Sequence, residues 1–150
     1  MATEAERELY RLHRENQAKY TYFLLAGAAA AIGFSLTQTR ELALSPTHLP
    51  LGAALLCWAA SFFCGCKQLQ YVTSTLYDNA ELLKVETGRH PLTGGHPEAI
   101  RVGSTTLRAA LEKSINRGSL FGAWQFRLLI YGALLYIAWH IFEMWVRSTL

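Results

Sequence analysis

The chain has 150 residues, 51% of them hydrophobic and 17% charged, and this length allows a single domain. Its net charge of +3 at pH 7 is too small and too evenly spread to indicate nucleic-acid binding. The three cysteines all lie within residues 57–66, which excludes an extracytoplasmic disulfide framework.

The hydrophobic residues gather in three segments, residues 20–37, 49–66 and 128–146. Each approaches the roughly 20 residues that cross about 30 Å of hydrocarbon. The first and third segments are apolar on all sides, so a soluble three-helix core would leave them without a polar face. The sequence therefore predicts an all-α membrane protein with three transmembrane helices, forming one membrane domain over residues 1–150.

Residues 1–19 carry charges of both signs and few apolar side chains, which is typical of a helix in water. No breaker separates them from the first span, so we expect one continuous helix. Its cytoplasmic part is either a solvated stalk or, as we favour, packs against residues 67–88. The acidic residues before the span, and the absence of a small-residue cleavage site after it, indicate a retained anchor.

The first span, residues 20–37, is poor in large side chains. It contains two overlapping small-xxx-small pairs, Ala26 with Ala30 and Gly27 with Ala31. Such pairs let helix backbones approach closely in lipid, so we expect these residues to pack against another helix.

The second apolar segment, residues 49–66, continues without a break into residues 67–88. Pro50 suits a first helical turn and Gly88 a helix stop, which predicts one helix over residues 50–87, about 58 Å long at 1.5 Å per residue. Beyond the span, an apolar stripe at helical spacing protrudes into the cytoplasm and calls for a packing partner. The stripe comprises Leu69, Val72, Leu76, Ala80 and Leu83.

Residues 89–119 are predicted to form a loop followed by a short surface helix over 105–116, which Ser104 caps and Gly118 ends. The third span follows, within residues 120–147. In the loop, the pair Gly94–Gly95 could hold a phosphate through backbone N–H groups. It lacks the length and the lysine of a phosphate loop, so an ordinary loop is the favoured interpretation.

The third span contains two ionisable residues, His140 and Glu143, which share a helix stripe with Tyr136. Ionisable residues in a span indicate a functional site by default, because burying them unpaired is costly. Three interpretations remain open: interfacial anchoring, with Glu143 paired to Arg147 one turn on; a polar contact between helices; and a pore or proton relay.

The distribution of basic residues gives the orientation. They are concentrated in residues 1–19 and 67–119, whereas the connector 38–48 and the tail after the third span hold one arginine each. The positive-inside rule therefore places the N-terminus and residues 67–119 in the cytoplasm and the C-terminus outside.

Catalytic and metal-binding patterns are missing from the sequence. The spacing of Cys64 and Cys66, without further ligands, does not complete a zinc shell and favours structural thiols. We therefore expect a protein that is not an enzyme and binds no cofactor or metal.

Two runs carry a resemblance to known sequences: KYTYFLLAGAAAAIGF at residues 19–34 and SFFCGCKQLQYVTSTLYDNAELLKVETGRHP at residues 61–91. Over roughly the first ninety residues the chain resembles short uncharacterised bacterial membrane proteins. The resemblance implies a bacterial inner-membrane location and carries over no functional residue.

The small residues of the first span and the protruding stripe both call for partners beyond the lipid bilayer. The leading hypothesis is a non-enzymatic homo-oligomer that acts as a pore-like or membrane-perturbing effector. The main alternative is a membrane-anchored adaptor that docks a soluble cytoplasmic protein through its helices. An intramembrane enzyme or proton relay using His140 and Glu143 is the third.

Overall fold

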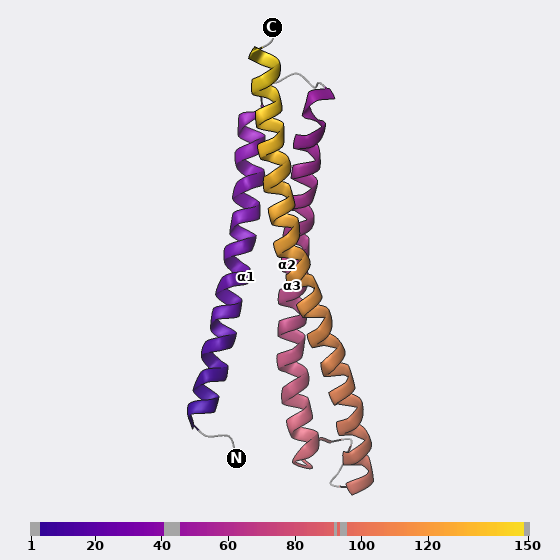
Figure 1. Ribbon diagram of the computed structural model, residues 1–150. Helices are drawn as coiled ribbons and strands as arrows, with labels where there is room; N and C mark the ends of the chain where they lie inside the picture. The colour runs from indigo at the N-terminus through magenta and orange to yellow at the C-terminus, as the bar shows by residue number, and fades with distance from the viewer. Residues whose placement is uncertain (1–3, 41–45, 92, 94–95, 149–150) are drawn as a thin grey trace. The chain divides into compact units, whose positions relative to one another are not determined.

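The computed structural model describes residues 4–40, 46–91, 93 and 96–148. Its elements are helix α1 (Glu4–Gln38), the short 3-10 helix η1 (Pro46–His48), α2 (Leu49–Glu86) and α3 (Pro97–Ser148) (Figure 1). Because the described residues contain helices and no strand, the all-α class is confirmed. Each of the three long helices is long and apolar enough to cross a membrane, as the sequence predicted.

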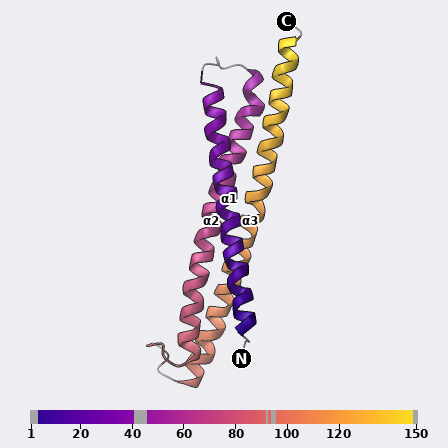
Figure 2. The same ribbon diagram turned by 90° about the vertical axis from the view of Figure 1, so that its left-hand side faces the viewer.

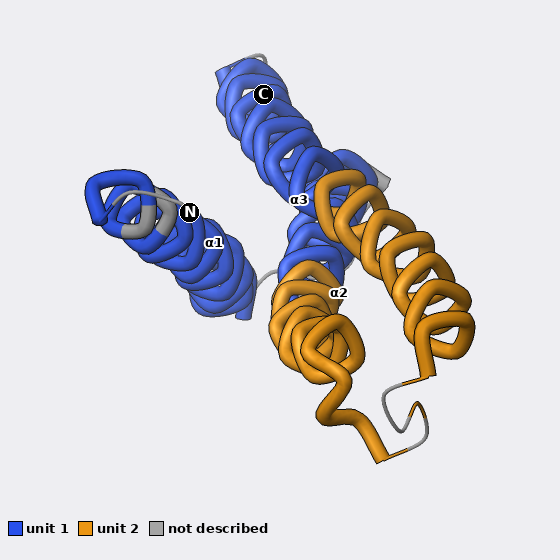
Figure 3. Tube along the Cα trace, turned by 90° about the horizontal axis from the view of Figure 1, so that it is seen from below, with its two compact units in different colours: residues 1–66, 122–150 blue, residues 67–121 orange. Residues whose placement is uncertain are grey.

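The chain divides into two compact units (Figure 3). Unit 1 comprises residues 1–66 and 122–150, and unit 2 comprises residues 67–121. Helices α2 and α3 each contribute to both units. Within unit 2, the second half of α2 and the first half of α3 run side by side in both views (Figures 1 and 2).

Helix α1 runs unbroken through residues 4–38, so the predicted junction of the charged segment with the first span is confirmed. Ion pairs one turn apart lie along its charged part, between Arg11 and Glu8 at 2.6 Å and between Lys19 and Glu15 at 2.7 Å. The hydrogen bond from Lys19 lowers the pKa of the Glu15 carboxyl below its usual value. These pairs are exposed, so solvent screens them and each stabilises the helix only weakly.

Helix α2 agrees with the predicted helix over residues 50–87 to within one residue at each end. Its end is a Schellman motif built on Gly88, which has a φ of 67°. The Gly88 N–H donates to the carbonyl oxygen of Val85 at 3.0 Å, and the Arg89 N–H donates to that of Lys84 at 2.9 Å. Glycine is needed at this position because other residues adopt a positive φ only with strain.

Helix α3 corrects the prediction of a separate short surface helix. The structure has one helix of 52 residues, and Gly118 lies inside it. A Cβ atom at Gly118 would lie 3.3 Å from Cβ of Tyr71, so this glycine allows close approach of α2 and does not end the helix. The Ser104 hydroxyl donates to the carbonyl oxygen of Arg101 at 3.0 Å, as a serine inside a helix does, and caps nothing.

Two predicted features fall partly on residues that the structure does not describe. Residues 41–45 of the connector between the first two spans lie outside the described residues, as does the Gly94–Gly95 pair of the phosphate hypothesis. The neighbouring Thr93 is described, and its hydroxyl donates to the carbonyl oxygen of His90 at 3.2 Å.

Candidate functional site

The predicted intramembrane polar site does not come together around one point. Glu143 accepts a hydrogen bond from Nε of Arg147 at 3.3 Å, which confirms the predicted pairing one turn apart. Tyr136 packs its ring between those of Trp58 and Trp139, at centroid distances of 5.7 and 5.6 Å. His140, in contrast, is exposed. No group of three His, Cys, Asp or Glu side chains among the described residues could hold a metal ion.

An aromatic cluster fills one part of the interior of unit 1. The Trp58 indole N–H donates to the carbonyl oxygen of Leu129 at 3.2 Å. A Cβ atom at Gly132 would lie 2.5 Å from Nε1 of Trp58, so only glycine lets this ring approach α3 so closely. The Trp139 side chain is 5% exposed, and its ring lies 6.0 Å from that of His48. The cluster therefore joins α2 to α3.

A second interior feature is a polar contact around Gln125 of α3. Gln125 is 0% exposed, and its amide nitrogen lies 3.5 Å from the carbonyl oxygen of Thr21 on α1. The Ser61 hydroxyl of α2 donates to the backbone carbonyl oxygen of Gln125 at 2.7 Å. A Cβ atom at Gly65 would lie 2.4 Å from the Gln125 amide nitrogen. One residue of α3 thus binds both other helices of unit 1, at a point where Gly65 leaves room for it.

Sequence reasoning missed both features. The only signal for the polar contact was the presence of Ser61 and Gln125 in otherwise apolar surroundings. Polar side chains hydrogen-bond between helices inside membranes, where each such contact contributes about 0.6 kcal/mol and at most about 1.7. The Gln125 amide oxygen is buried and has no hydrogen-bond partner among the described residues.

The small residues of α1 lie on its outer face. Ala26, Gly27 and Ala30 are exposed and Ala31 is half-buried. No described atom lies within 4 Å of a Cβ atom built on Gly27. The inner face of α1 consists instead of Thr21, Leu24, Leu25, Ala28 and Ser35. The small-xxx-small pairs do not face the other helices of unit 1. That they pack against a helix stays a prediction, and this helix would have to come from elsewhere.

The predicted stripe on α2 is also turned outward within unit 2. Leu69 and Val72 are half-buried, whereas Ala80 is exposed and Leu76 and Leu83 are 46% and 62% exposed. The face of α2 that meets α3 lies one residue away along the sequence. It consists of Gln68, Tyr71, Thr75, Asp78, Leu82 and Val85, all of them buried or half-buried.

Polar and aromatic contacts hold the two helices of unit 2 together. The Arg108 guanidinium of α3 donates to Glu86 of α2 at 2.6 Å. The rings of Tyr71 and Phe121 stack with centroids 5.7 Å apart. On α2 itself, the hydrogen bond from Lys84 to the Glu81 carboxylate raises the pKa of the lysine. Charged side chains on both helices make this unit unsuited to hydrocarbon.

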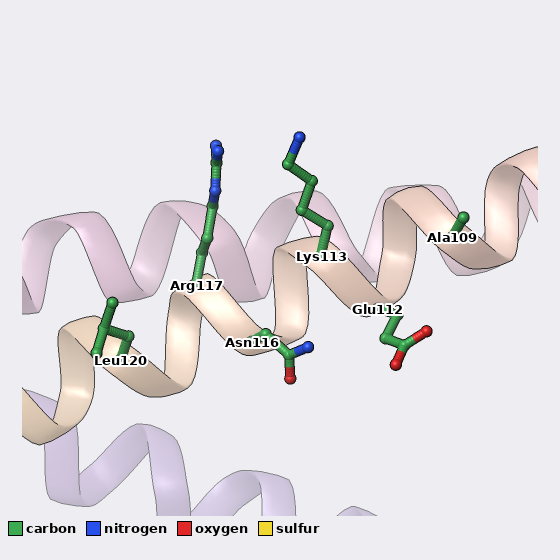
Figure 4. A pocket seen from close by; sticks show the side chains of 6 residues that line it. All are labelled: Ala109, Glu112, Lys113, Asn116, Arg117 and Leu120. Atoms are coloured by element: carbon green, nitrogen blue, oxygen red, sulfur yellow. The ribbon is translucent and has the colours of Figure 1, made fainter.

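A shallow hollow of about 440 Å³ lies along α3 in unit 2 (Figure 4). Lys113 and Arg117 extend to one side of the α3 ribbon, and Glu112 and Asn116 extend to the other. Ala109 and Leu120 complete the lining. All six residues belong to one helix, so the hollow is an open groove along its surface and does not enclose a small molecule.

The three cysteines, Cys57, Cys64 and Cys66, are free and half-buried in unit 1. Comparison of the chain with known proteins gives no further assignment: no family model matches it, nor does any curated protein or solved structure.

Proposed function

We propose that this chain is a non-enzymatic membrane protein that works as a homo-oligomer, and that the assembly is a pore-like or membrane-perturbing effector. The three apolar helices would anchor unit 1 in the bilayer, with unit 2 in water on the cytoplasmic side. Copies would associate through surfaces that one copy leaves exposed.

The observation that carries the proposal is the direction of the α2 stripe. In unit 2, the face that packs inside the protomer includes Gln68, Thr75 and Asp78, while the more apolar neighbouring face is turned out. Exposed apolar area in water costs about 25 cal/mol per Å², so a row of exposed leucines favours association. Leu76 and Leu83 are the most exposed members of this row.

The exposed small residues of α1 support the same proposal for the membrane part. In lipid, close van der Waals contact takes over from the hydrophobic effect as the force between helices. Ala26, Gly27 and Ala30 offer a surface on which a helix of another copy could rest. Because Trp58, Trp139 and Gln125 are buried inside unit 1, a permeation path would have to form between copies and not through one.

For location we propose the bacterial inner membrane, with the N-terminus and unit 2 in the cytoplasm and the C-terminus outside, on the distribution of basic residues. Thiol reporters would test this in a variant without native cysteines. A cysteine at the exposed Thr87 should resist an impermeant reagent in intact cells, and one at the exposed Ser148 should react. The reverse labelling pattern would refute the orientation.

The functional test is leakage from reconstituted vesicles. Wild type should release a trapped ion, with a steep dependence on the ratio of protein to lipid, because several copies form each leak. Leu83→Glu puts a charge in the stripe and should abolish release. Tyr77→Glu is the matched control, because Tyr77 is equally exposed on α2 but lies outside the stripe. Tight vesicles at every wild-type ratio would rule out the effector.

The hollow on α3 favours one alternative, a membrane-anchored adaptor. Its lining of Lys113, Arg117 and Glu112 around Leu120 offers charged and apolar groups to a soluble partner. An adaptor would leave vesicles tight and bind a specific soluble protein. Lys113→Glu with Arg117→Glu would then end that binding without altering the oligomeric state.

A further inference from the structure

Unit 2 presents two parallel heptad patterns on α2, one residue apart in register. The inner pattern is the face that meets α3. The outer pattern consists of Leu69, Val72, Leu76, Asn79 and Leu83, at alternating spacings of three and four. In coiled-coil terms its a positions are all leucine, and its d positions are Val72 and Asn79. We call these five residues the outer seam.

The outer seam fits the coiled-coil pattern more closely than the inner face does. Four of its five residues are apolar, and none is charged. The inner face, with Gln68, Thr75 and Asp78, already packs within the protomer. In the described part of unit 2, nothing covers the exposed leucines of the outer seam, Leu76 and Leu83.

We propose that the outer seam pairs with the same seam of other copies, in parallel and in register. This inference rests on the proposed function, because copies inserted in one orientation carry the seam at the same height above the bilayer. Anchoring in one membrane also raises the effective concentration of neighbouring seams, which favours pairing over a short contact of two heptads.

The seam is complementary to itself. The Asn79 amide both donates and accepts hydrogen bonds, so identical asparagines that face each other across a parallel seam satisfy one another. A polar residue at a single a position fixes the register of a coiled coil, and we expect Asn79 at d to act in the same way. The next d position is Glu86, which does not extend the seam. Its carboxylate would repel its own copy, and it is already bound by Arg108 at 2.6 Å within the protomer. The self-complementary part therefore ends at Leu83.

The residue types also indicate how many copies meet. Leucine at a with isoleucine at d shifts parallel coiled coils away from dimers and toward trimers or tetramers, and we extend this to valine because it is β-branched as well. Leu69 and Val72 follow this pattern. We therefore assign the seam to an assembly of more than two copies, whose unit 2 helices surround a common axis.

Cysteine cross-linking tests the seam in the full chain reconstituted in vesicles, with Cys57, Cys64 and Cys66 replaced by alanine. Single cysteines at Leu76 and at Leu83 should form disulfides between copies when oxidant is added. Ser74→Cys is the matched control: Ser74 is also exposed on α2, but it points about 170° away from the seam at 100° per residue, and it should not cross-link.

A second variant guards against a cysteine that disturbs the assembly. Asn79→Asp places like charges across the seam and should abolish the cross-link at Leu83→Cys at neutral pH, while Asn79→Gln keeps it. The mass of the assembly, measured in parallel, distinguishes a failure of the seam from a failure of the proposed function. An oligomer that cross-links at Ser74→Cys, or at none of the three positions, would overturn the seam and leave the proposed function standing. A monomer would overturn both.

Discussion

The two units use their polar residues in opposite ways. Inside unit 1, the side chains of Ser61 and Gln125 hydrogen-bond between helices, while large apolar residues such as Phe23 and Leu56 point outward. Inside unit 2, polar side chains form much of the helix contact, and leucines point outward among charged residues. An outward apolar face carries no free-energy penalty in lipid, but exposing it to water costs free energy.

This difference explains why exposed apolar side chains call for different surroundings in the two units. In the proposed membrane arrangement, the exposed apolar residues of unit 1 would need only lipid to cover them. Exposed leucines in unit 2 would need another protein surface, because the charged side chains around them favour water over hydrocarbon. Three variants and one pH titration test this contrast, in order of decreasing expected effect.

Leu76→Pro should have the largest effect, and it should be confined to unit 2. Proline removes a backbone donor and clashes with the preceding turn, which costs about 3 kcal/mol or more. We expect loss of the assembly on native electrophoresis, while the three spans still insert. An oligomer that persists unchanged would mean that α2 beyond residue 66 is only a stalk.

Gly132→Ala should destabilise unit 1 by about 1–3 kcal/mol, because the added Cβ overlaps the Trp58 indole, a rigid ring that cannot easily move. Gly52→Ala is the control, since no described atom lies within 4 Å of its Cβ position. Both variants gain the same helix propensity, so their difference isolates the contact. The measurement is the unfolding midpoint followed by tryptophan fluorescence. Equal midpoints would show that Trp58 does not pack there.

Ser61→Ala should cost about 0.6 kcal/mol and at most about 1.7, the usual range for a hydrogen bond between membrane helices. The substitution removes the hydroxyl that donates to the backbone carbonyl oxygen of Gln125, 2.7 Å away. Ser119→Ala, at an exposed site of α3, should be silent under the same unfolding assay. A silent Ser61→Ala would mean that packing alone, without this bond, positions the three helices of unit 1.

Acidification should have the smallest effect, at the charged start of α1. The Lys19 hydrogen bond lowers the pKa of Glu15 in the folded chain. A lowered carboxyl pKa stabilises the helix above the ordinary pKa of 4.5, and that contribution is lost as the pH falls through the folded value. Helix content by circular dichroism should drop slightly over this window in wild type. Glu15→Gln should remove that part of the drop, and an identical curve would contradict the assignment.

Helix ends were predictable from the sequence where a capping or turn residue within a few positions decides them. Pro50 and Gly88 gave the bounds of α2 because caps and turns are decided within a few residues. Gly118 misled for the opposite reason: its role is set by Tyr71, a residue of another helix. Burial of Gln125 likewise depends on Gly65 and Thr21, which approach only in the folded chain. The stripe on α2 was visible in sequence, but the direction it faces was not.

The most direct test of self-association is to count subunits in vesicles at low protein density, by stepwise photobleaching of one label per chain. We predict three or more steps for wild type and for Tyr77→Glu, and a single step for Leu83→Glu, because only the last charges the outer seam. Single steps for wild type, or the same distribution for all three proteins, would contradict the account.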